Sequence, residues 1–223
     1  FHYLFRSRHY AHGGAYAGAS ENGTCATLHT MAVNGYGTAS PDTRLELNFY
    51  TGRVEVDGKY VTLDDGTPLQ YMPLAVEQNL TASKYIETAG ARMKKYEVDR
   101  TAYSDGRLPD NDIVLYRYAD VLLMKAEAKV RNGESGDEQL NAVRSRVGMP
   151  SLAATLANIL DERLLELVWE GWRRQDMIRF GTYCAPYDIH TPSAADKKRY
   201  TIVFPIPEKA RELNPNLAQN PGY

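Results

Sequence analysis

The chain lacks several features that would assign it to a class at once. Its formal net charge is −2, so it has no basic excess of the kind that dedicated nucleic-acid-binding domains carry. No apolar run approaches the ~20 residues needed to cross a bilayer. It has two cysteines, Cys25 and Cys184, and neither their spacing nor a motif favours a disulfide between them. With 43% hydrophobic residues, the 223-residue chain can fold around an apolar core without a disulfide or a metal.

Short catalytic motifs are also absent, including the phosphate-binding loop, HExxH, GxSxG and paired CxxC. Two patterns raise the question of a metal. His9 and His12 have a helical spacing, but Gly13 and Gly14 disfavour a helix there and no acidic third ligand is obvious. The carboxylates of residues 104–112 do not match an EF-hand, so solvated turns are favoured over a calcium site. We therefore expect no metal site.

What the chain does have is a stretch with helical periodicity between residues 112 and 181. A first helix is predicted from an N-cap at Asp112 to a C-cap at Asn132, and a second ends at Gly148. Because few residues separate them, these two helices should form an antiparallel hairpin. A third helix, largely buried, is predicted from about 158 to 180.

The periodicity also predicts which face of the first helix is apolar. On an ideal helix, one arc carries Val114, Leu115, Tyr118, Val121, Leu122, Ala126 and Ala128. The opposite arc carries Arg117, Asp120, Glu127 and Arg131. The apolar arc should therefore face the core.

Charged residues form a stripe on the third predicted helix. Glu166 and Glu170 lie one turn apart, at a spacing that a glycosidase acid pair could use. Neighbouring arginines would lower the pKa of both, whereas a general acid needs a raised pKa. A structural ion-pair network is therefore favoured for the stripe, which contains Glu162, Arg163, Glu166, Glu170, Arg173 and Arg174.

The rest of the chain is less regular. Residues 1–40 are rich in aromatic and small residues without a sustained period, and 43–63 alternate around turn signals that predict a small hairpin or meander. Residues 200–207 read as a strand ended by prolines, and the last residues should not be helical. Four aromatic residues are candidates for exposed stacking platforms, or pack beneath the loops: Tyr16, Tyr36, Phe49 and Tyr50.

Several segments together resemble the SusD-like (RagB/SusD) family over about residues 40–223. These are RYADVLLMKAEAKVRNG, LNAVRSRVGMP, LDERLLELVWEGWRRQDMIRFG and FPIPEKARELNPNLAQNPGY, in that order. Upstream, SPDTRL at 40–45 is similar to the family's DPRL segment, with Thr43 where proline is usual. GARMKKYEVD at 90–99 resembles its basic KY segment.

The resemblance implies a mainly α fold, with a scaffold of tetratricopeptide-like helical hairpins, long irregular loops and a few short strands. The chain would be one SusD-like C-terminal region, 1–223. Its parts would be a loop and short-strand part carrying the ligand site (1–110), a helical scaffold (111–181) and an extended tail (182–223).

The resemblance also implies a function that involves neither catalysis nor a cofactor. The protein would be a surface-exposed lipoprotein of a Bacteroidetes-type outer membrane, attached through a lipid anchor upstream of this chain. It would bind oligosaccharide and deliver it to a TonB-dependent, SusC-like transporter. Nucleic acid is not an expected partner.

The family often places an aromatic residue in an NGW-like context shortly before the DPRL segment. Asn34-Gly35-Tyr36 occupies the similar place, so Tyr36 with Asn34 is the predicted ligand-binding pair, followed by Tyr16 and Asn22. Three alternatives stay open: a peptide-binding member of the same family, a carbohydrate-active enzyme using the two glutamates named above, and a purely structural scaffold.

Overall fold

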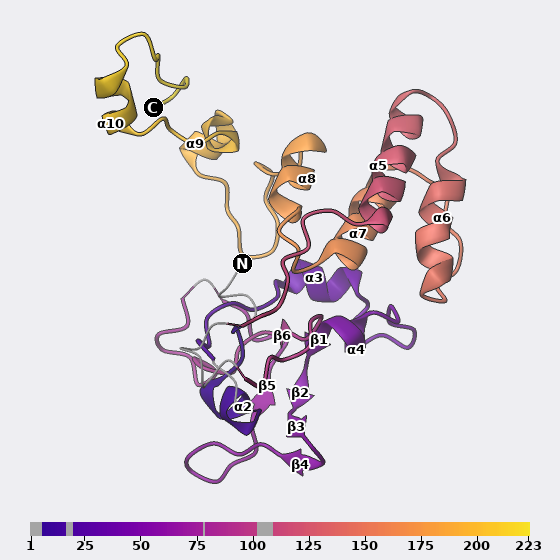
Figure 1. Ribbon diagram of the computed structural model, residues 1–223, viewed down its shortest axis with the longest axis vertical. Helices are drawn as coiled ribbons and strands as arrows, with labels where there is room; N and C mark the ends of the chain where they lie inside the picture. Colours follow the sequence, from indigo (N-terminus) through magenta and orange to yellow (C-terminus); the bar gives the residue numbers. More distant parts are fainter. Residues whose placement is uncertain (1–5, 17–19, 78, 102–108) are drawn as a thin grey trace. The chain divides into compact units, whose positions relative to one another are not determined.

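A computed structural model of the chain describes residues 6–16, 20–77, 79–101 and 109–223. The chain divides into two compact units, Phe1–Arg173 and Arg174–Tyr223 (Figure 1). The described part is mainly helical with a few two-residue strands, which confirms the predicted fold class. No described helix is both long and apolar enough to span a membrane.

Three helices form the scaffold of the first unit: α5 (Tyr118–Arg131), α6 (Asp137–Arg146) and α7 (Leu156–Leu167). Helix α5 packs against both of the others (Figure 1). The turn between α5 and α6 requires Gly136, because a β-carbon there would lie 2.7 Å from the carbonyl oxygen of Ala126. The predicted antiparallel hairpin is therefore confirmed.

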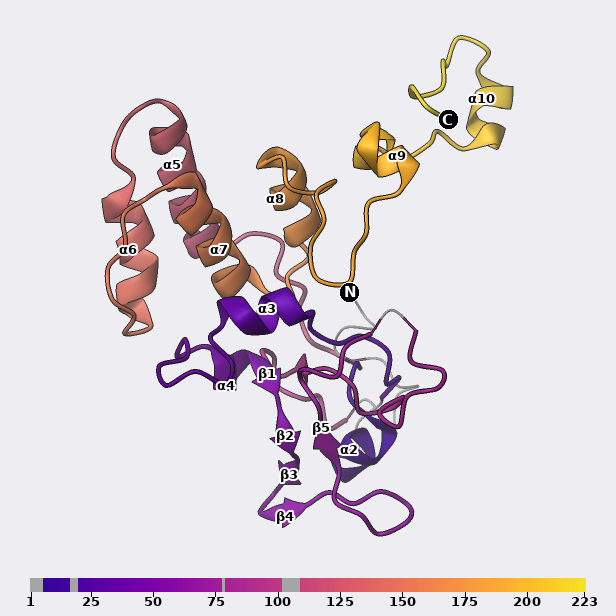
Figure 2. The same cartoon turned by 180° about the vertical axis from the view of Figure 1, so that it is seen from behind.

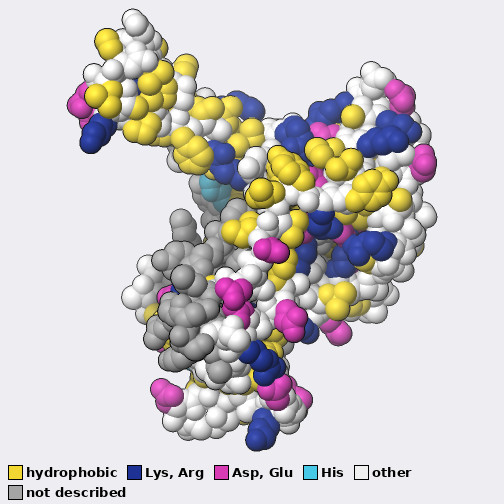
Figure 3. Space-filling model, viewed as in Figure 1, with side chains coloured by type: hydrophobic (Ala, Val, Ile, Leu, Met, Phe, Trp, Pro, Cys, Tyr) yellow, Lys and Arg dark blue, Asp and Glu magenta, His cyan; other side chains and the backbone are white. Residues whose placement is uncertain are grey.

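The predicted start and orientation of the first helix were wrong. Helix α5 begins at Tyr118 rather than after Asp112, and its buried side contains Asp120 and Leu123. Asp120 is buried because its Oδ1 accepts a bond of 2.7 Å from Nη1 of Arg163. Apolar residues of the predicted core arc are instead exposed, Tyr118 by 75% and Val121 by 47%. Hydrophobic side chains are correspondingly visible on the surface over α5 (Figure 3).

The predicted third helix is two helices. Helix α7 ends at Leu167 and α8 spans Arg173–Arg179. Between them Trp169 and Gly171 adopt φ values of 68° and 83°, which interrupt a right-handed helix. The indole Nε1 of Trp169 donates to the carbonyl oxygen of Asn48 at 3.0 Å, so the break fastens the scaffold to the loop part.

The described residues of the loop part form three short helices, α2 (Tyr10–Ala15), α3 (Leu28–Val33) and α4 (Leu45–Asn48). Three antiparallel strand pairs follow: β1 (Phe49–Tyr50) with β6 (Arg92–Met93), β2 (Gly52–Arg53) with β5 (Gln70–Tyr71), and β3 (Glu55–Val56) with β4 (Lys59–Tyr60). The β3–β4 pair is a hairpin, as predicted. Helix α3 lies beside α7 and connects the loop part to the scaffold (Figure 2).

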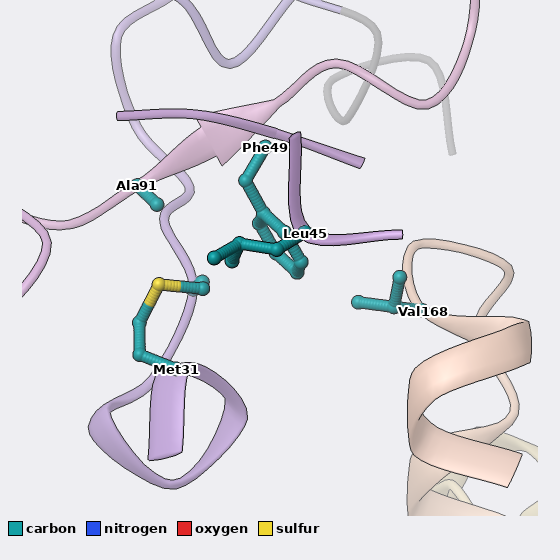
Figure 4. Packing of buried hydrophobic residues seen from close by; sticks show 6 residues of the cluster. Met31, Leu45, Phe49, Ala91 and Val168 are labelled. Carbon is teal, nitrogen blue, oxygen red and sulfur yellow. The ribbon is translucent and has the colours of Figure 1, made fainter. Parts of the chain in front are cut away.

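Two apolar clusters support these loops. The first cluster consists of Ala26, Met31, Leu45, Phe49, Ala91 and Val168 (Figure 4). Tyr36 and Trp169 pack against it. The second cluster consists of Val54, Val56, Val61, Leu69 and Tyr71, with Ala11, Tyr16, Tyr50 and Leu63 packed against it. In β1, Phe49 belongs to the first cluster and Tyr50 packs against the second, because successive side chains of a strand point to opposite faces.

The second unit contains most of α8 and three further short helices. These are α9 (Ala194–Lys197), the 3₁₀ helix η1 (Tyr200–Ile202) and α10 (Glu208–Leu213). A capping box between Ser193 and Asp196 starts α9. The predicted strand at 200–207 was wrong, since its first residues are 3₁₀-helical after a left-handed Arg199 at φ 62°. Residues after Asn214 form no helix, as predicted.

Candidate functional site

A buried guanidinium joins the DPRL-like segment to helix α7. Arg44 is 3% exposed, and its Nη2 donates to Oδ2 of Asp42 at 2.8 Å. Its Nη1 donates to Oε1 of Glu162 at 2.7 Å and to Oε2 of Glu166 at 2.9 Å. The two glutamates lie four residues apart on α7, so they present their carboxylates on one face of the helix. One arginine therefore bridges a loop and two turns of the scaffold.

Further cations from other segments complete this buried ion network. The pairs are Arg144–Glu162 at 2.6 Å, Arg146–Glu166 at 2.6 Å, Arg117–Glu166 at 2.6 Å, Arg117–Glu170 at 2.8 Å, and Lys95–Glu170. The ion pairing predicted for the glutamates of the stripe is therefore confirmed, whereas Arg163 of the stripe pairs with Asp120 of α5. The cations come from distant positions in the sequence as well as from the neighbouring helix, and not from α7 itself.

The network sets the protonation of its members. Burial would raise the pKa of Glu166, but Arg117, Arg44 and Arg146 outweigh it, and the pKa lies below its ordinary value. Burial lowers the pKa of the Lys95 amine despite its contact with Glu170. A glycosidase using Glu166 and Glu170 would need an open cleft and a carboxyl with a raised pKa. Both side chains are instead at most 2% exposed and ion-paired, which does not support the enzyme alternative.

The predicted pair Asn34 and Tyr36 lies in the turn that ends α3. The amide of Gly35 donates to the carbonyl oxygen of Ala32 at 2.9 Å, and the amide of Tyr36 to that of Met31 at 3.0 Å. With Gly35 at φ +70°, this is a Schellman cap, which commonly brings its last residue into apolar contact with the helix. The turn is thus rigid in backbone and fixes the direction of Tyr36.

The two members of the pair are unequally accessible. Tyr36 is half-buried and packs against the first cluster. Asn34 has no exposed surface, and its Nδ2 donates to the carbonyl oxygen of Thr30 at 2.8 Å. In this arrangement Asn34 supports the turn from within. Its predicted role in ligand binding stays a prediction, as does that of Tyr36.

Tyr16 packs on the second cluster rather than on the first. Its hydroxyl lies 3.4 Å from that of Tyr50, and the guanidinium of Arg100 lies 4.9 Å from its ring centre. His12 packs against both rings, with centroids 5.4 Å from Tyr16 and 4.5 Å from Tyr50. Burial and nearby positive charge lower the pKa of His12 to about 3, so the imidazole is neutral. We call His12, Tyr16, Tyr50 and Tyr71 the Tyr–His cluster.

Asn22 is held by contacts with two arginines. It adopts a left-handed φ of 46°, its amide donates to the carbonyl oxygen of Arg8 at 3.1 Å, and its Oδ1 accepts from Nη2 of Arg92 at 3.1 Å. Arg92 pairs with Tyr50 in the β1–β6 ladder. Asn22 and Tyr16 thus belong to the same part of the loops, and Asn34 and Tyr36 to another. Sequence reasoning assigned no role to Arg92 or Lys95, although both lie in the KY-like segment.

The remaining candidates have structural partners. Phe49 is 2% exposed in the first cluster and forms no platform. Nε2 of His9 contacts a carboxylate oxygen of Glu87 at 3.0 Å, and Nδ1 of His12 contacts the Tyr71 hydroxyl at 3.0 Å. Among the described residues, no group of His, Cys, Asp and Glu could hold a metal, and residues 104–108 of the segment considered for calcium lie outside them. Both cysteines are free thiols.

The described residues thus form a helical-hairpin scaffold to which buried ion pairs fasten irregular, aromatic-bearing loops. Residues 30–223 match the SusD family, and the chain belongs to that family. The resemblance seen in the sequence is thereby confirmed. The segments that carried it, around Arg44, Lys95 and Glu166, are the segments that build the ion network.

Two curated relatives are named as SusD proteins. The starch-binding protein SusD of Bacteroides thetaiotaomicron is 30% identical over 139 residues, which covers 59% of this chain and 25% of that protein. The SusD-like protein P38 of Formosa agariphila is 30% identical over 132 residues, 52% of this chain and 25% of that protein. The chain thus spans about a quarter of the length of these relatives.

Solved structures share the fold over more of the chain. Surface glycan-binding protein A from Bacteroides uniformis superposes with a TM-score of 0.58 at 23% identity, covering 91% of this chain and 42% of that one. NanU of B. fragilis superposes with a TM-score of 0.56 at 25% identity, covering 88% and 39%. By name, these four proteins include a starch-binding protein and a glycan-binding protein, and none of them is named as an enzyme.

Proposed function

We propose that this chain is the C-terminal part of a non-enzymatic protein that binds oligosaccharide at the cell surface and delivers it to a TonB-dependent, SusC-like transporter. The observation that carries the proposal is membership of a family whose curated relative is a starch-binding protein. The same membership leads us to place the protein on the outer membrane as a lipoprotein. Attachment would use a lipid anchor upstream of this chain.

The turn after α3 supplies a surface suited to that function. Sugar rings bind to proteins by stacking their C–H faces on aromatic rings, and such a contact needs no titrating group. Tyr36 offers part of its ring from a backbone that the Gly35 cap holds fixed. A ring held in this way loses little conformational freedom on binding, which favours affinity. We assign Tyr36 as the stacking residue, with Tyr16 and Asn22 on a separate part of the loops.

Substitution of Tyr36 by alanine in the full-length protein tests this assignment. One aromatic contact is worth about 0.5–1.5 kcal/mol, so malto-oligosaccharide binding, measured by calorimetry at a temperature where the variant is folded, should weaken roughly two- to tenfold. Tyr60→Ala is the matched control, because Tyr60 is 57% exposed on β4 and away from the turn.

Three results would contradict parts of the proposal. Lowered melting temperature with unchanged binding would make Tyr36 a purely structural residue. Saturable binding of peptides and none of glycans would favour the peptide-binding alternative. Release of shortened products from the oligosaccharide would show catalysis and overturn the non-enzymatic assignment.

A further inference from the structure

The first unit contains a pocket beside the turn that carries Tyr36. Its volume is about 250 Å³, and its wall includes Gly35 and Ser40 from the turn and Asn158 and Asp161 from α7. Pockets for drug-sized ligands measure roughly 300–1,000 Å³, so this pocket suits a smaller molecule. It is distinct from the half-buried ring of Tyr36, which does not line the pocket.

Three polar side chains of the wall retain hydrogen-bonding capacity. Within the described residues, the carboxylate of Asp161 has no hydrogen-bond or ion-pair partner, and neither has the hydroxyl of Ser40. Asn158 donates through Nδ2 to the carbonyl oxygen of Ala153 at 2.9 Å, which leaves its Oδ1 as an acceptor. Two acceptors and one hydroxyl thus belong to residues that line a single small space. Vicinal hydroxyl groups are the ligands that such a set satisfies best.

The charged members of the wall disfavour an anion. Arg144 already has partners: its Nη1 donates to Glu162 at 2.6 Å, and its Nε donates to the carbonyl oxygen of Pro150 at 2.8 Å. Asp42 is committed to Arg44. Because Asp42 and Glu162 are each paired with an arginine, the charge left on the wall is that of Asp161. A ligand carrying its own carboxylate would meet like charge in a partly desolvated space.

The rest of the wall is apolar. It is formed by Val33, Met149, Leu152 and Leu165. An apolar wall facing polar side chains suits a molecule with one C–H face and one hydroxyl edge, which is the amphipathic character of a pyranose ring. The thioether of Met149 adapts its shape to irregular ligand surfaces.

We propose that this pocket binds one uncharged pyranose ring, with Asp161 and Asn158 accepting from its hydroxyl groups. The inference rests on the proposed oligosaccharide binding and adds a subsite to it. Since Gly35 lines the pocket and Tyr36 follows it in the chain, one end of an oligosaccharide could occupy the pocket while a neighbouring unit stacks on Tyr36.

The test uses the full-length protein and two monosaccharides, methyl α-glucopyranoside and glucuronate, followed by NMR titration. We expect saturable binding of the uncharged sugar and at least tenfold weaker binding of the acid. Leu152→Trp should fill the pocket and abolish binding, because Leu152 is a wall residue with 40% of its surface exposed. Leu47→Trp is the matched control, since Leu47 is 65% exposed on α4 and does not line the pocket. Asp161→Ala gives a second variant that leaves the ion network intact and should weaken binding at least tenfold.

Three results would each overturn the pocket assignment. Glucuronate could bind as tightly as the uncharged sugar or more tightly. Binding of the uncharged sugar could survive both Leu152→Trp and Asp161→Ala, or no monosaccharide could bind saturably. If malto-oligosaccharide still binds in a manner that depends on Tyr36, the pocket inference fails alone. If neither monosaccharide nor oligosaccharide binds, the proposed function fails with it.

Discussion

The ion network beneath α7 and the Tyr–His cluster of the loops bury polar groups in opposite ways. The network keeps its groups charged and pairs them, as Arg44 does with three carboxylates. The Tyr–His cluster keeps its imidazole neutral, with His12 at 0% exposure between tyrosine rings. Paired buried charges fix geometry but tolerate no missing partner. A neutral cluster tolerates small changes but is sensitive to pH.

The largest expected effect comes from removing the central cation of the network. Arg44→Leu would leave Asp42, Glu162 and Glu166 buried with fewer partners, and breaking a buried pair costs about 3–5 kcal/mol. The free energy of unfolding from urea titration measures this loss. Arg100→Leu is the control, because Arg100 pairs with Asp57 at the surface and its loss should cost at most about 1 kcal/mol. A loss no larger than that of the control would show that the network contributes little to stability.

The next effect is the pH dependence of stability, which differs between the Tyr–His cluster and the ion network. His12 takes up a proton near pH 6.5 in the unfolded chain, but near pH 3 in the folded chain. Between these values the folded state binds fewer protons, so stability falls as pH falls, by about 1.4 kcal/mol per unit. Asp42 and Glu166, whose pKa values are lowered, lose their contribution only below about pH 4.5. The window from pH 6.5 to 5 therefore reports the Tyr–His cluster.

His12→Phe checks this assignment by removing the titrating group while keeping an aromatic ring. Unfolding free energies measured at several pH values should show a shallower slope between pH 6.5 and 5 in the variant. Above pH 7 both proteins should show no slope from this residue. An unchanged slope below pH 6.5 would mean that His12 protonates in the folded state.

The smallest expected effect concerns Thr43, which stands where the family usually has proline. Its Oγ1 donates to the carbonyl oxygen of Val147 at 2.6 Å, which links the DPRL-like segment to the end of α6. Because the bond is exposed, Thr43→Val should cost about 0.5 kcal/mol in thermal unfolding. Ser145→Ala, which removes a hydroxyl bond of 3.3 Å within α6, should change nothing measurable. Equal effects would show that the link to α6 adds no stability.

The same comparison explains what sequence reasoning could reach. The ends of α5 and α6 were predictable, because periodicity and the Asn132 and Gly148 stop signals are local. The charge stripe of α7 predicted a network, but its partners Arg44 and Lys95 lie 118 and 75 residues from their glutamates and carry no local signal. Tertiary contact decided these pairings.

Two local predictions failed because a tertiary contact overrode the local sequence pattern. The apolar face of α5 was assigned by hydrophobicity, whereas the Asp120–Arg163 pair turns the charged side inward. A periodic pattern ran through Trp169, whose left-handed backbone breaks the helix where its indole bonds to Asn48. At the site, the sequence suggested Tyr36, but the burial of Asn34 depends on how α3 packs and could not be predicted from its residue type.

The break after α7 has a spectroscopic consequence. The chain has two tryptophans, Trp169 and Trp172, and both lie in that break. Trp169 packs on the first cluster, and the ring of Trp172 lies 5.4 Å from that of Tyr116. Emission excited at the tryptophan band of this chain therefore originates at the connection between scaffold and loops. Fluorescence thus reports separation of these two parts directly, while a melting curve followed by circular dichroism reports the helices themselves.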